Sequence, residues 1–272
     1  MNVSIYTLQV RRAIDGPGPD KLLKHYFDMG IVAGDVVESE LRELSLKEYN
    51  KYITDSGMYF GAFVGLADII TAKGRELEEN EARIKGYIDE LDSLGVNKIM
   101  LAPTVVNAES PEEFYDMRER MVEGFGKMVD YARGSGVKVT IENQSVPQRA
   151  DSRIADCKYI LDQIPELGFV FDAGNFFCVE ESALDAWEVL GARSVHSHMK
   201  DWEFYEFGRI VRSNMPALRS SVMGEGLVGL DKLLPKMKAD GYDGSMVLEV
   251  NGRPFTTEIM DKSAEFLLSY CK

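Results

Sequence analysis

The sequence predicts an α/β protein that folds as a single (β/α)8 TIM barrel domain spanning residues 1–272. Eight short apolar runs alternate with amphipathic helical patterns, and 272 residues divided among eight repeats give 34 residues each, enough for one strand, one helix and their connections. A doubly wound open sheet shows the same alternation. Eight repeats followed by a closing C-terminal helical pattern favour the closed barrel.

Strands and helices can be assigned in order along the N-terminal half. Four runs rich in β-branched and aromatic residues are predicted strands: 3–9, 31–38, 58–66 and 97–102. Asp20 and Ser45 are suited to cap the helices after the first two strands, because their side chains accept hydrogen bonds from free backbone N–H groups. A long charged helix is predicted at 77–94, and Gly95 ends it.

The C-terminal half continues the same alternation. Ser110 and Pro111 open the helix after the fourth strand, as its N-cap and its first helical residue. Four further strands are predicted at 137–142, 168–172, 193–198 and 245–250. The remaining helices are predicted at 152–164, 180–190, 230–240 and 256–270.

The segment 199–229 has no regular pattern and is expected to be a loop or lid with short helical pieces. It carries four aromatic residues: Trp202, Phe204, Tyr205 and Phe207. Aromatic side chains suit a cover over a pocket or a contact between subunits. We therefore expect this segment to close the site or to contribute to a homo-oligomer, either a dimer or a tetramer.

Each of the last four predicted strands ends on a residue that can bind a metal: Glu142, Asp172, His198 and Glu249. Alternate residues of a strand share one face, so the face of these four also carries Thr140 and His196. The other face carries mostly large apolar residues. The four side chains are therefore expected inside the barrel at its C-terminal rim, where barrel enzymes place their chemistry.

Three carboxylates and one imidazole suit a single divalent ion, with Mn²⁺ as the first choice and Zn²⁺, Mg²⁺ or Co²⁺ as alternatives. Such an ion could polarise a carbonyl and stabilise an enediolate while Glu142 or Glu249 moves a proton. The competing interpretation treats each residue separately, as a helix cap, a solvated loop residue or a core histidine. His196 is interpreted as a supporting or core residue rather than a ligand.

Composition restricts the partners of the protein. The formal net charge is −14 and the isoelectric point is about 4.8, so the surface repels phosphates and anionic lipids. We expect no nucleic acid and no membrane partner. The three cysteines lack disulfide or zinc-site spacing, and the N-terminal residues do not resemble a signal peptide. These features predict a cytoplasmic protein.

The motifs TIEN, FDAGN, HSHMKD, GEG and GYDGSMVLEVN together resemble the xylose isomerase-like barrels, grouped as sugar phosphate isomerases and epimerases. The likeness covers essentially the whole chain and is most specific over 137–251. It implies a TIM barrel and a small-molecule carbohydrate substrate. It also implies that Glu142, Asp172, His198 and Glu249 bind a divalent metal, and that the two glutamates form the acid/base pair.

Four further residues are candidates for substrate contacts: Asn175, Lys200, Asp201 and Arg253. Lys200 and Asp201 match the H-x-K-D signature of the family, which implies a substrate contact or an orienting ion pair; a surface pair is the alternative. Asn175 stands where many relatives have histidine, so it can bind a hydroxyl group but cannot relay a proton. Arg253 could pair with a carboxylate of the substrate.

The leading hypothesis is a divalent-metal-dependent isomerase or epimerase that acts on a sugar or sugar derivative. The run MKD after His198 differs from the T-G-E-x-x-R run of ketose 3-epimerases, so a metal-dependent lyase or dehydratase and a non-catalytic or partner-dependent barrel remain alternatives. An endonuclease IV-like enzyme is disfavoured by the acidic charge and the three histidines. The GEG turn at 224–226 could bind phosphate, but Glu225 favours a neutral polyol or keto sugar.

Overall fold

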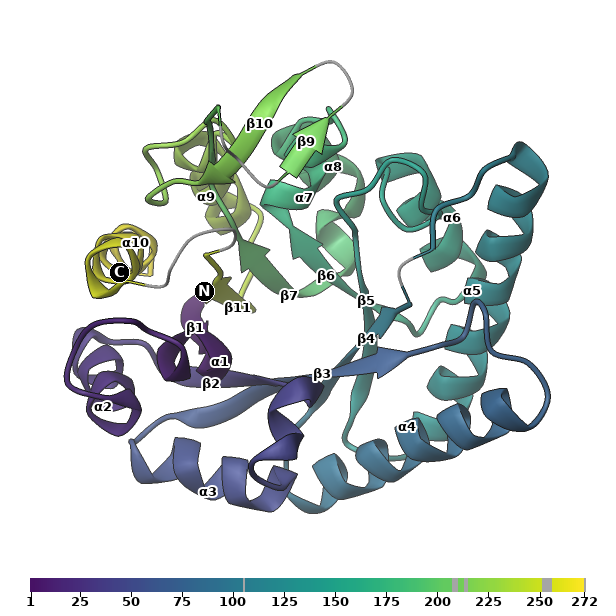
Figure 1. Cartoon of the computed structure of the whole chain (residues 1–272), viewed down its shortest axis with the longest axis horizontal. Helices are drawn as coiled ribbons and strands as arrows, with labels where there is room; N and C mark the ends of the chain where they lie inside the picture. The colour runs from purple at the N-terminus through teal and green to yellow at the C-terminus, as the bar shows by residue number, and fades with distance from the viewer. Residues whose placement is uncertain (105, 207–209, 213–214, 251–255, 272) are drawn as a thin grey trace.

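The computed structural model describes residues 1–104, 106–206, 210–212, 215–250 and 256–271. Within this part of the chain, eight parallel strands close into a barrel in the order β1-β11-β7-β6-β5-β4-β3-β2 (Figure 1). The barrel strands are β1 (Asn2–Tyr6), β2 (Ala33–Val37), β3 (Tyr59–Ala67), β4 (Lys98–Pro103), β5 (Lys138–Glu142), β6 (Gly168–Asp172), β7 (Ser194–Met199) and β11 (Ser245–Leu248). The predicted TIM barrel is confirmed.

Helices surround this barrel in the order that the alternation predicts (Figure 1). The longer ones are α2 (Pro19–Met29), α3 (Leu46–Asp55), α4 (Arg75–Ser93), α5 (Pro111–Ala132), α6 (Ile154–Gln163), α8 (Ala183–Leu190), α9 (Leu230–Ala239) and α10 (Thr257–Ser269). The shorter ones are α1 (Thr7–Arg11), η1 (Glu38–Arg42), α7 (Ala173–Cys178) and η2 (Gly191–Arg193). No helix among the described residues is long and apolar enough to cross a bilayer.

The two faces of the strands form two separate hydrophobic clusters, as the alternation of residues predicts. Inside the barrel, Val170 and Val247 pack with three other residues that also point inward: Tyr6, Val64 and Met100. Outside it, Phe169 and Leu248 belong to the large cluster that the strands share with the helices. The face that carries Asp172 is therefore the inner face, and strand geometry alone directs its side chain into the barrel.

The first strand is shorter than predicted. The chain leaves β1 after Tyr6 and turns into α1. Thr7 Oγ1 lies 3.1 Å from the carbonyl oxygen of Asp35 and 2.9 Å from Glu40 Oε2, both on neighbouring elements. These buried contacts replace the strand ladder, so the prediction of a strand through Gln9 was wrong.

Helix starts were predicted with mixed success. Ser45 and Ser110 cap α3 and α5, since each hydroxyl accepts a hydrogen bond from a backbone N–H three residues on. Asp20 does not cap α2, because Pro19 already opens that helix. The helix α6 starts at Ile154 rather than at Ser152, whose hydroxyl donates to the loop carbonyl of Val146 at 2.6 Å.

The described residues of the segment 199–229 form strands instead of the predicted helical pieces. After β7, three short strands form an antiparallel sheet in the order β8-β10-β9 (Figure 1): β8 (Trp202–Phe204), β9 (Ile210–Arg212) and β10 (Met215–Ser220). Phe207 lies outside the described residues. The proposed roles of this segment as a pocket cover or a homo-oligomer contact stay predictions.

Candidate metal centre and active site

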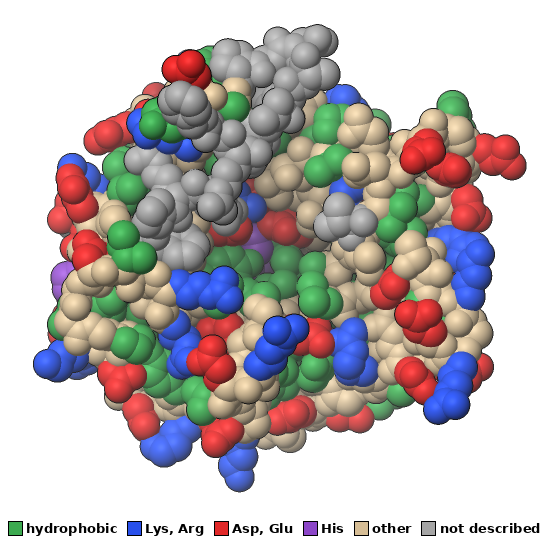
Figure 2. Space-filling model, viewed as in Figure 1, with side chains coloured by type: hydrophobic (Ala, Val, Ile, Leu, Met, Phe, Trp, Pro, Cys, Tyr) green, Lys and Arg blue, Asp and Glu red, His purple; other side chains and the backbone are tan. Residues whose placement is uncertain are grey.

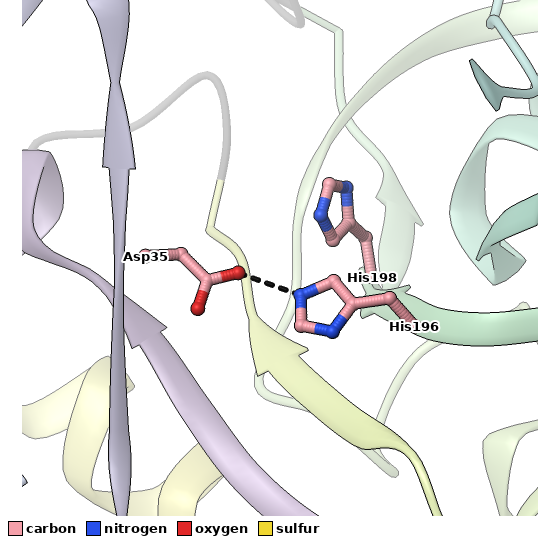
Figure 3. A group of neighbouring side chains, drawn as sticks. All are labelled: Asp35, His196 and His198. Atoms are coloured by element: carbon pink, nitrogen blue, oxygen red, sulfur yellow. Dashed lines mark hydrogen bonds and ion pairs between the residues drawn. The ribbon is translucent and has the colours of Figure 1, made fainter. Parts of the chain in front are cut away.

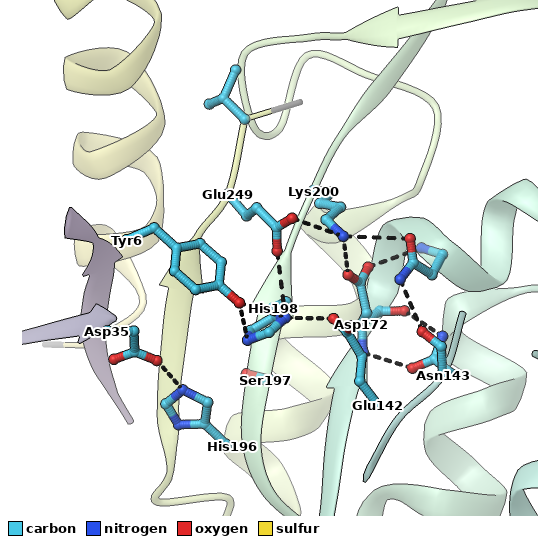
Figure 4. A network of polar contacts seen from close by, with 12 residues as sticks. Tyr6, Asp35, Glu142, Asn143, Asp172, His196, Ser197, His198, Lys200 and Glu249 are labelled. Carbon is cyan, nitrogen blue, oxygen red and sulfur yellow. Dashed lines mark hydrogen bonds and ion pairs between the residues drawn. The ribbon is translucent and has the colours of Figure 1, made fainter. Parts of the chain in front are cut away.

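Four side chains converge at the C-terminal mouth of the barrel: Glu142, Asp172, His198 and Glu249. One potential ligand atom from each lies within 4.8 Å of the others. Figure 2 shows this face of the molecule hollowed at its centre, with acidic and histidine side chains at the floor of the hollow. The residues that the sequence places on four different strand ends thus meet in one cluster (Figure 4).

Strand register explains why these side chains meet. Asp172 pairs directly with His198 between β6 and β7. On the other side of β7, His198 pairs with Val247 of β11, and Glu249 follows on the same face two residues later. Glu142 ends β5, next to β6. The parallel register therefore brings all four residues to one rim of the barrel.

His198 is the centre of the cluster. Its Nδ1 lies 2.5 Å from Glu142 Oε1 and 3.4 Å from Glu249 Oε2, and its Nε2 lies 3.1 Å from the hydroxyl of Tyr6. Burial alone would lower the pKa of His198, but the carboxylates of Glu142, Glu249 and Asp172 raise it to about 9. The imidazole is therefore cationic at neutral pH in the protein without a bound cation.

Lys200 forms ion pairs with two of the carboxylates of the cluster, Asp172 and Glu249. Its Nζ lies 2.5 Å from Asp172 Oδ2 and 3.0 Å from Glu249 Oε1, and the side chain is buried. Burial lowers the pKa of Lys200, but Asp172, Glu249 and Glu142 raise it well above its ordinary value. The predicted substrate contact Lys200 thus lies among the candidate ligands, where its ammonium group could also reach a substrate oxygen.

The carboxylates differ in how readily they ionise. Burial raises the pKa of Glu142, but His198 and Lys200 lower it to about 2. Asp172 is buried more completely, and desolvation together with the charges of Glu142 and Glu249 raises its pKa to about 7 despite the contact with Lys200. Glu142 is therefore ionised throughout the physiological range, whereas Asp172 holds a proton part of the time.

A divalent cation fits this set of residues. When all three carboxylates are ionised they face two cationic side chains, His198 and Lys200, and the cluster then carries one more negative charge than positive. A bound divalent ion requires the neutral form of His198, and the charges then balance. Oxygen and imidazole donors are the ligands that Mn²⁺, Mg²⁺, Co²⁺ and Zn²⁺ accept. Glu142, Asp172, His198 and Glu249 are the residues that would hold the ion.

Asn175 fixes the direction of Asp172. Asp172 Oδ1 accepts a hydrogen bond from the backbone N–H of Asn175 at 2.9 Å, which makes Asp172 the N-cap of α7. The side-chain oxygen of Asn175 accepts from Lys200 at 3.4 Å. The helix α7 was not predicted, because six residues after a strand are too few to show a helical period.

Close packing at Gly174 holds α7 against the residues that follow β7. A Cβ atom built at this glycine would lie 2.5 Å from the Cβ of Lys200 and 2.7 Å from Nε1 of Trp202. The same indole nitrogen donates to the carbonyl of Gly174 at 3.0 Å. Only glycine fits here without displacement, so the position of α7, and with it the cap at Asp172, depends on this residue.

Asp201 lies next to Lys200 in sequence but faces another structure. Its Oδ2 accepts from the backbone N–H groups of Gly224 and Gly226 at 2.9 and 3.1 Å, and its Oδ1 accepts from Trp202 and Val228 at 3.0 Å each. The carboxylate therefore organises the GEG turn. The predicted substrate contact of Asp201 stays a prediction, and Arg253 lies outside the described residues.

Replacing Asp201 with alanine should destabilise the protein by about 2–4 kcal/mol, because several backbone N–H groups would lose a charged acceptor. Chemical denaturation of the variant against the wild type measures this difference. Asp243→Ala, which removes an exposed carboxylate from a loop, is the matched control and should change the free energy of unfolding by less than about 0.5 kcal/mol. Equal stability of the two variants would contradict the assigned role.

A second polar group lies deeper in the barrel, beneath His198 (Figure 3). Asp35 Oδ2 lies 2.6 Å from His196 Nε2, and Asp35 Oδ1 accepts from the hydroxyl of Ser4 at 2.5 Å. The carboxylate of Asp35 is closely packed as well, because a Cβ atom at Gly61 would collide with its Oδ1. Asp35, His196 and His198 also lie close enough together to hold a cation, so the interpretation of His196 as a supporting or core residue stays a prediction.

Comparison with known families agrees with this geometry. A family model described as xylose isomerase-like TIM barrel matches residues 26–270. The chain belongs to this family.

One curated relative of this xylose isomerase-like chain is the inosose isomerase of Halalkalibacterium halodurans. It is 22% identical over 190 residues, which are 69% of this chain and 64% of the relative. The chain therefore spans slightly less than two thirds of the length of that relative.

Solved structures of the same architecture superpose over nearly the whole chain. The IolI protein with a bound zinc atom has a TM-score of 0.78 and 17% identity, and covers 99% of this chain and 98% of its own. The probable 3-DHS dehydratase AsbF of Bacillus anthracis has a TM-score of 0.75 and 15% identity, with 98% and 99% covered. At these identities the likeness shows a shared fold.

Sequence reasoning missed three residues that contact the cluster in this xylose isomerase-like barrel. Tyr6 reaches His198, Gln144 Nε2 donates to Glu142 Oε2 at 3.2 Å, and Asn143 binds the backbone of Asp172. Tyr6 could have been found by the same alternation, since it lies two residues after Ser4 on the inner face of β1. Asn143 and Gln144 follow the strand end, where alternation no longer applies.

Proposed function

We propose that this protein is a divalent-metal-dependent isomerase or epimerase that moves a proton beside the carbonyl group of a sugar or a ketone derived from a polyol. The convergence of Glu142, Asp172, His198 and Glu249 at the barrel mouth carries the proposal. The name of the inosose isomerase supports the substrate class, and the zinc in the IolI structure supports a metal in this kind of barrel.

The two glutamates are the proposed acid/base pair. Both contact His198, and Lys200 also contacts Glu249, so the pair borders one small space at the mouth. The pKa of Glu142, about 2, keeps this side chain ionised at neutral pH, which is the form that can accept a proton. One glutamate would take the proton from the carbon beside the carbonyl, and the other would return one. A divalent ion held there would polarise that carbonyl and stabilise the enediolate charge.

The remaining polar residues favour a neutral substrate. The backbone N–H groups of Gly224 and Gly226, which could otherwise bind a phosphate, already donate to Asp201. Lys200 and Asn175 offer a donor and an amide that suit hydroxyl groups, and Arg253 remains a proposed substrate contact. We therefore propose a neutral keto sugar or inosose with Mn²⁺ as the preferred ion.

Elimination is the second candidate reaction. A carbanion beside a carbonyl can expel a hydroxyl group from the next carbon instead of recovering a proton, and the same glutamate would start both reactions. The structural likeness to a probable 3-DHS dehydratase makes this outcome worth measuring. An unsaturated product would assign the protein as a dehydratase, whereas a saturated isomer would assign it as an isomerase or epimerase.

Solvent exchange tests the proposal directly. The purified protein is analysed for metals, loaded with Mn²⁺ and incubated in D₂O with a panel of ketoses and inososes. We expect deuterium to enter the substrate at the carbon beside the carbonyl, as detected by NMR, and to be absent with chelator-treated protein. A protein that holds Mn²⁺ but exchanges no proton on any member of the panel would contradict the proposal and favour a non-catalytic barrel.

A further inference from the structure

Two side-chain amides at the barrel mouth each hold a backbone segment beyond the end of a strand ladder. Between β5 and β6 the last backbone pair joins Glu142 and Val170. Between β1 and β11 the last pair joins Ile5 and Leu248. The strand pairing ends at these points, so the next backbone N–H and C=O groups need other partners.

Asn143 provides those partners for Asp172, two residues beyond the last pair. Its side-chain oxygen accepts from the backbone N–H of Asp172 at 2.8 Å, and its side-chain nitrogen donates to the carbonyl of Asp172 at 3.0 Å. Asn143 is fully buried, and its own carbonyl accepts from Asn175 at 2.8 Å. The amide thus continues the β5–β6 ladder by one step, at the residue whose carboxylate enters the cluster (Figure 4).

Gln9 makes the same arrangement on the other side of the barrel. Its side-chain oxygen accepts from the backbone N–H of Val250 at 3.3 Å, and its side-chain nitrogen donates to the carbonyl of Val250 at 3.2 Å. Val250 is again two residues beyond the last pair, and it directly follows Glu249. Gln9 is buried in α1, the helix that replaces the predicted end of the first strand.

A side-chain amide is suited to pair with both the backbone N–H and the backbone C=O of one residue. It presents one donor and one acceptor side by side, as a backbone peptide does, whereas a carboxylate has no donor and an alkyl chain has neither. Two unrelated positions have the same solution at strand ends that carry Asp172 and Glu249. Coordinating side chains keep their geometry only if their backbone is held, and partners of this kind strongly influence metal affinity.

We infer that Asn143 and Gln9 are positioning residues that fix Asp172 and Glu249 for a divalent ion. This inference rests on the proposed function, because it assumes that both carboxylates are ligands. It assigns to the two amides a role in metal affinity and coordination geometry beyond their contribution to folding.

Titration of the metal-free protein with Co²⁺ tests the inference, with visible absorption as the readout of coordination. Asn143→Leu and Gln9→Met remove both hydrogen bonds without adding charge. Asn143→Asp and Gln9→Glu keep the shape and remove the donor. Thr140→Val and Ser197→Ala are matched controls, since each removes a buried hydrogen bond from a side chain to the carbonyl of a neighbouring strand at about 3 Å. Denaturation curves are recorded for every variant.

We expect Asn143→Leu and Gln9→Met to weaken Co²⁺ binding by about 10–100-fold and to change the absorption spectrum. The controls should lose stability and yet bind Co²⁺ with the wild-type affinity and spectrum. If Asn143→Leu does not fold, Asn143→Asp tests the inference instead. Its added negative charge by itself favours cation binding, so weaker Co²⁺ binding by this variant would show that Asp172 is displaced.

Wild-type affinity and spectrum in the amide variants would overturn the inference and leave the proposed function intact. A wild-type protein that binds no Co²⁺ at this cluster would overturn both.

Discussion

Glu249→Gln and Glu142→Gln, made separately, are each expected to lower the rate of substrate proton exchange by about 10²–10⁴-fold, the usual contribution of a general acid or base. A glutamine keeps the shape of the side chain and can still offer an oxygen to a cation, but it cannot accept a proton. Deuterium exchange at saturating Mn²⁺ measures the loss. Metal content is determined in parallel, so that weakened binding and lost proton transfer are separated.

Glu225→Gln is the matched control for these two variants. It removes one exposed carboxylate from the GEG turn near the mouth without touching the cluster, and should exchange protons at the wild-type rate. If both Glu142→Gln and Glu249→Gln bind metal and retain full activity, the acid/base assignment is wrong. If only one of the two variants loses activity, the glutamate replaced in that variant is the only one that transfers the substrate proton.

Metal binding is expected to strengthen steeply with pH. A bound ion requires His198 neutral and Asp172 ionised, whereas in the metal-free protein the pKa of His198 is raised to about 9 and that of Asp172 to about 7. Between pH 7 and 9, one proton leaves His198 for each ion bound, so the affinity should rise about tenfold per pH unit. Below pH 7 a second proton leaves Asp172, and the slope should approach about a hundredfold per unit.

Glu142 should not contribute to this dependence, because its pKa of about 2 keeps it ionised over the whole range. Calorimetric titration of Mn²⁺ at a series of pH values, in buffers of different ionisation enthalpy, gives both the affinity and the number of protons released. A pH-independent affinity between pH 6 and 9 would contradict the assignment of His198 as a ligand.

The stability of the metal-free protein should fall as the pH rises, whereas the metal affinity increases. The raised pKa of His198 means that the folded state holds a proton that the unfolded chain releases near its ordinary pKa of about 6.5. That contribution to stability is complete below this value and is lost as the pH rises through about 9. Bound metal would replace it at high pH.

The eight strand–helix repeats predicted the barrel, and residue alternation within the strands predicted the four-residue cluster. A strand has a strict period of two, so the inward direction of His198 and Asp172 followed from the pattern of their neighbours. The order of strands around the barrel then followed from the chain, because consecutive parallel strands lie side by side in this fold. Strand alternation and strand order together placed His198 and Glu249 in one cluster, although they are 51 positions apart in the sequence.

The sequence predictions were wrong or incomplete where the path of the backbone depends on contacts between residues distant in sequence. The end of β1 depends on how Thr7 meets Asp35 and Glu40, which are distant in sequence. The small sheet after β7 forms through pairing of β8 and β9 with β10, and its strands are too short to show a period. The role of Asp201 as an acceptor for the GEG turn likewise depends on a segment more than twenty residues away.

The tight approach of α7 to the residues that follow β7 has an evolutionary consequence. Because a side chain at position 174 would occupy the space of Lys200 and Trp202, these three positions cannot vary independently. The atom of Lys200 that such a side chain would meet is Cβ, so in homologous chains we expect a larger residue at 174 only together with glycine at 200 and a residue smaller than tryptophan at 202. We therefore expect glycine two residues after the strand-six aspartate and K-D-W after the strand-seven histidine to occur together in chains that pack α7 in this way. A single motif would not identify such chains.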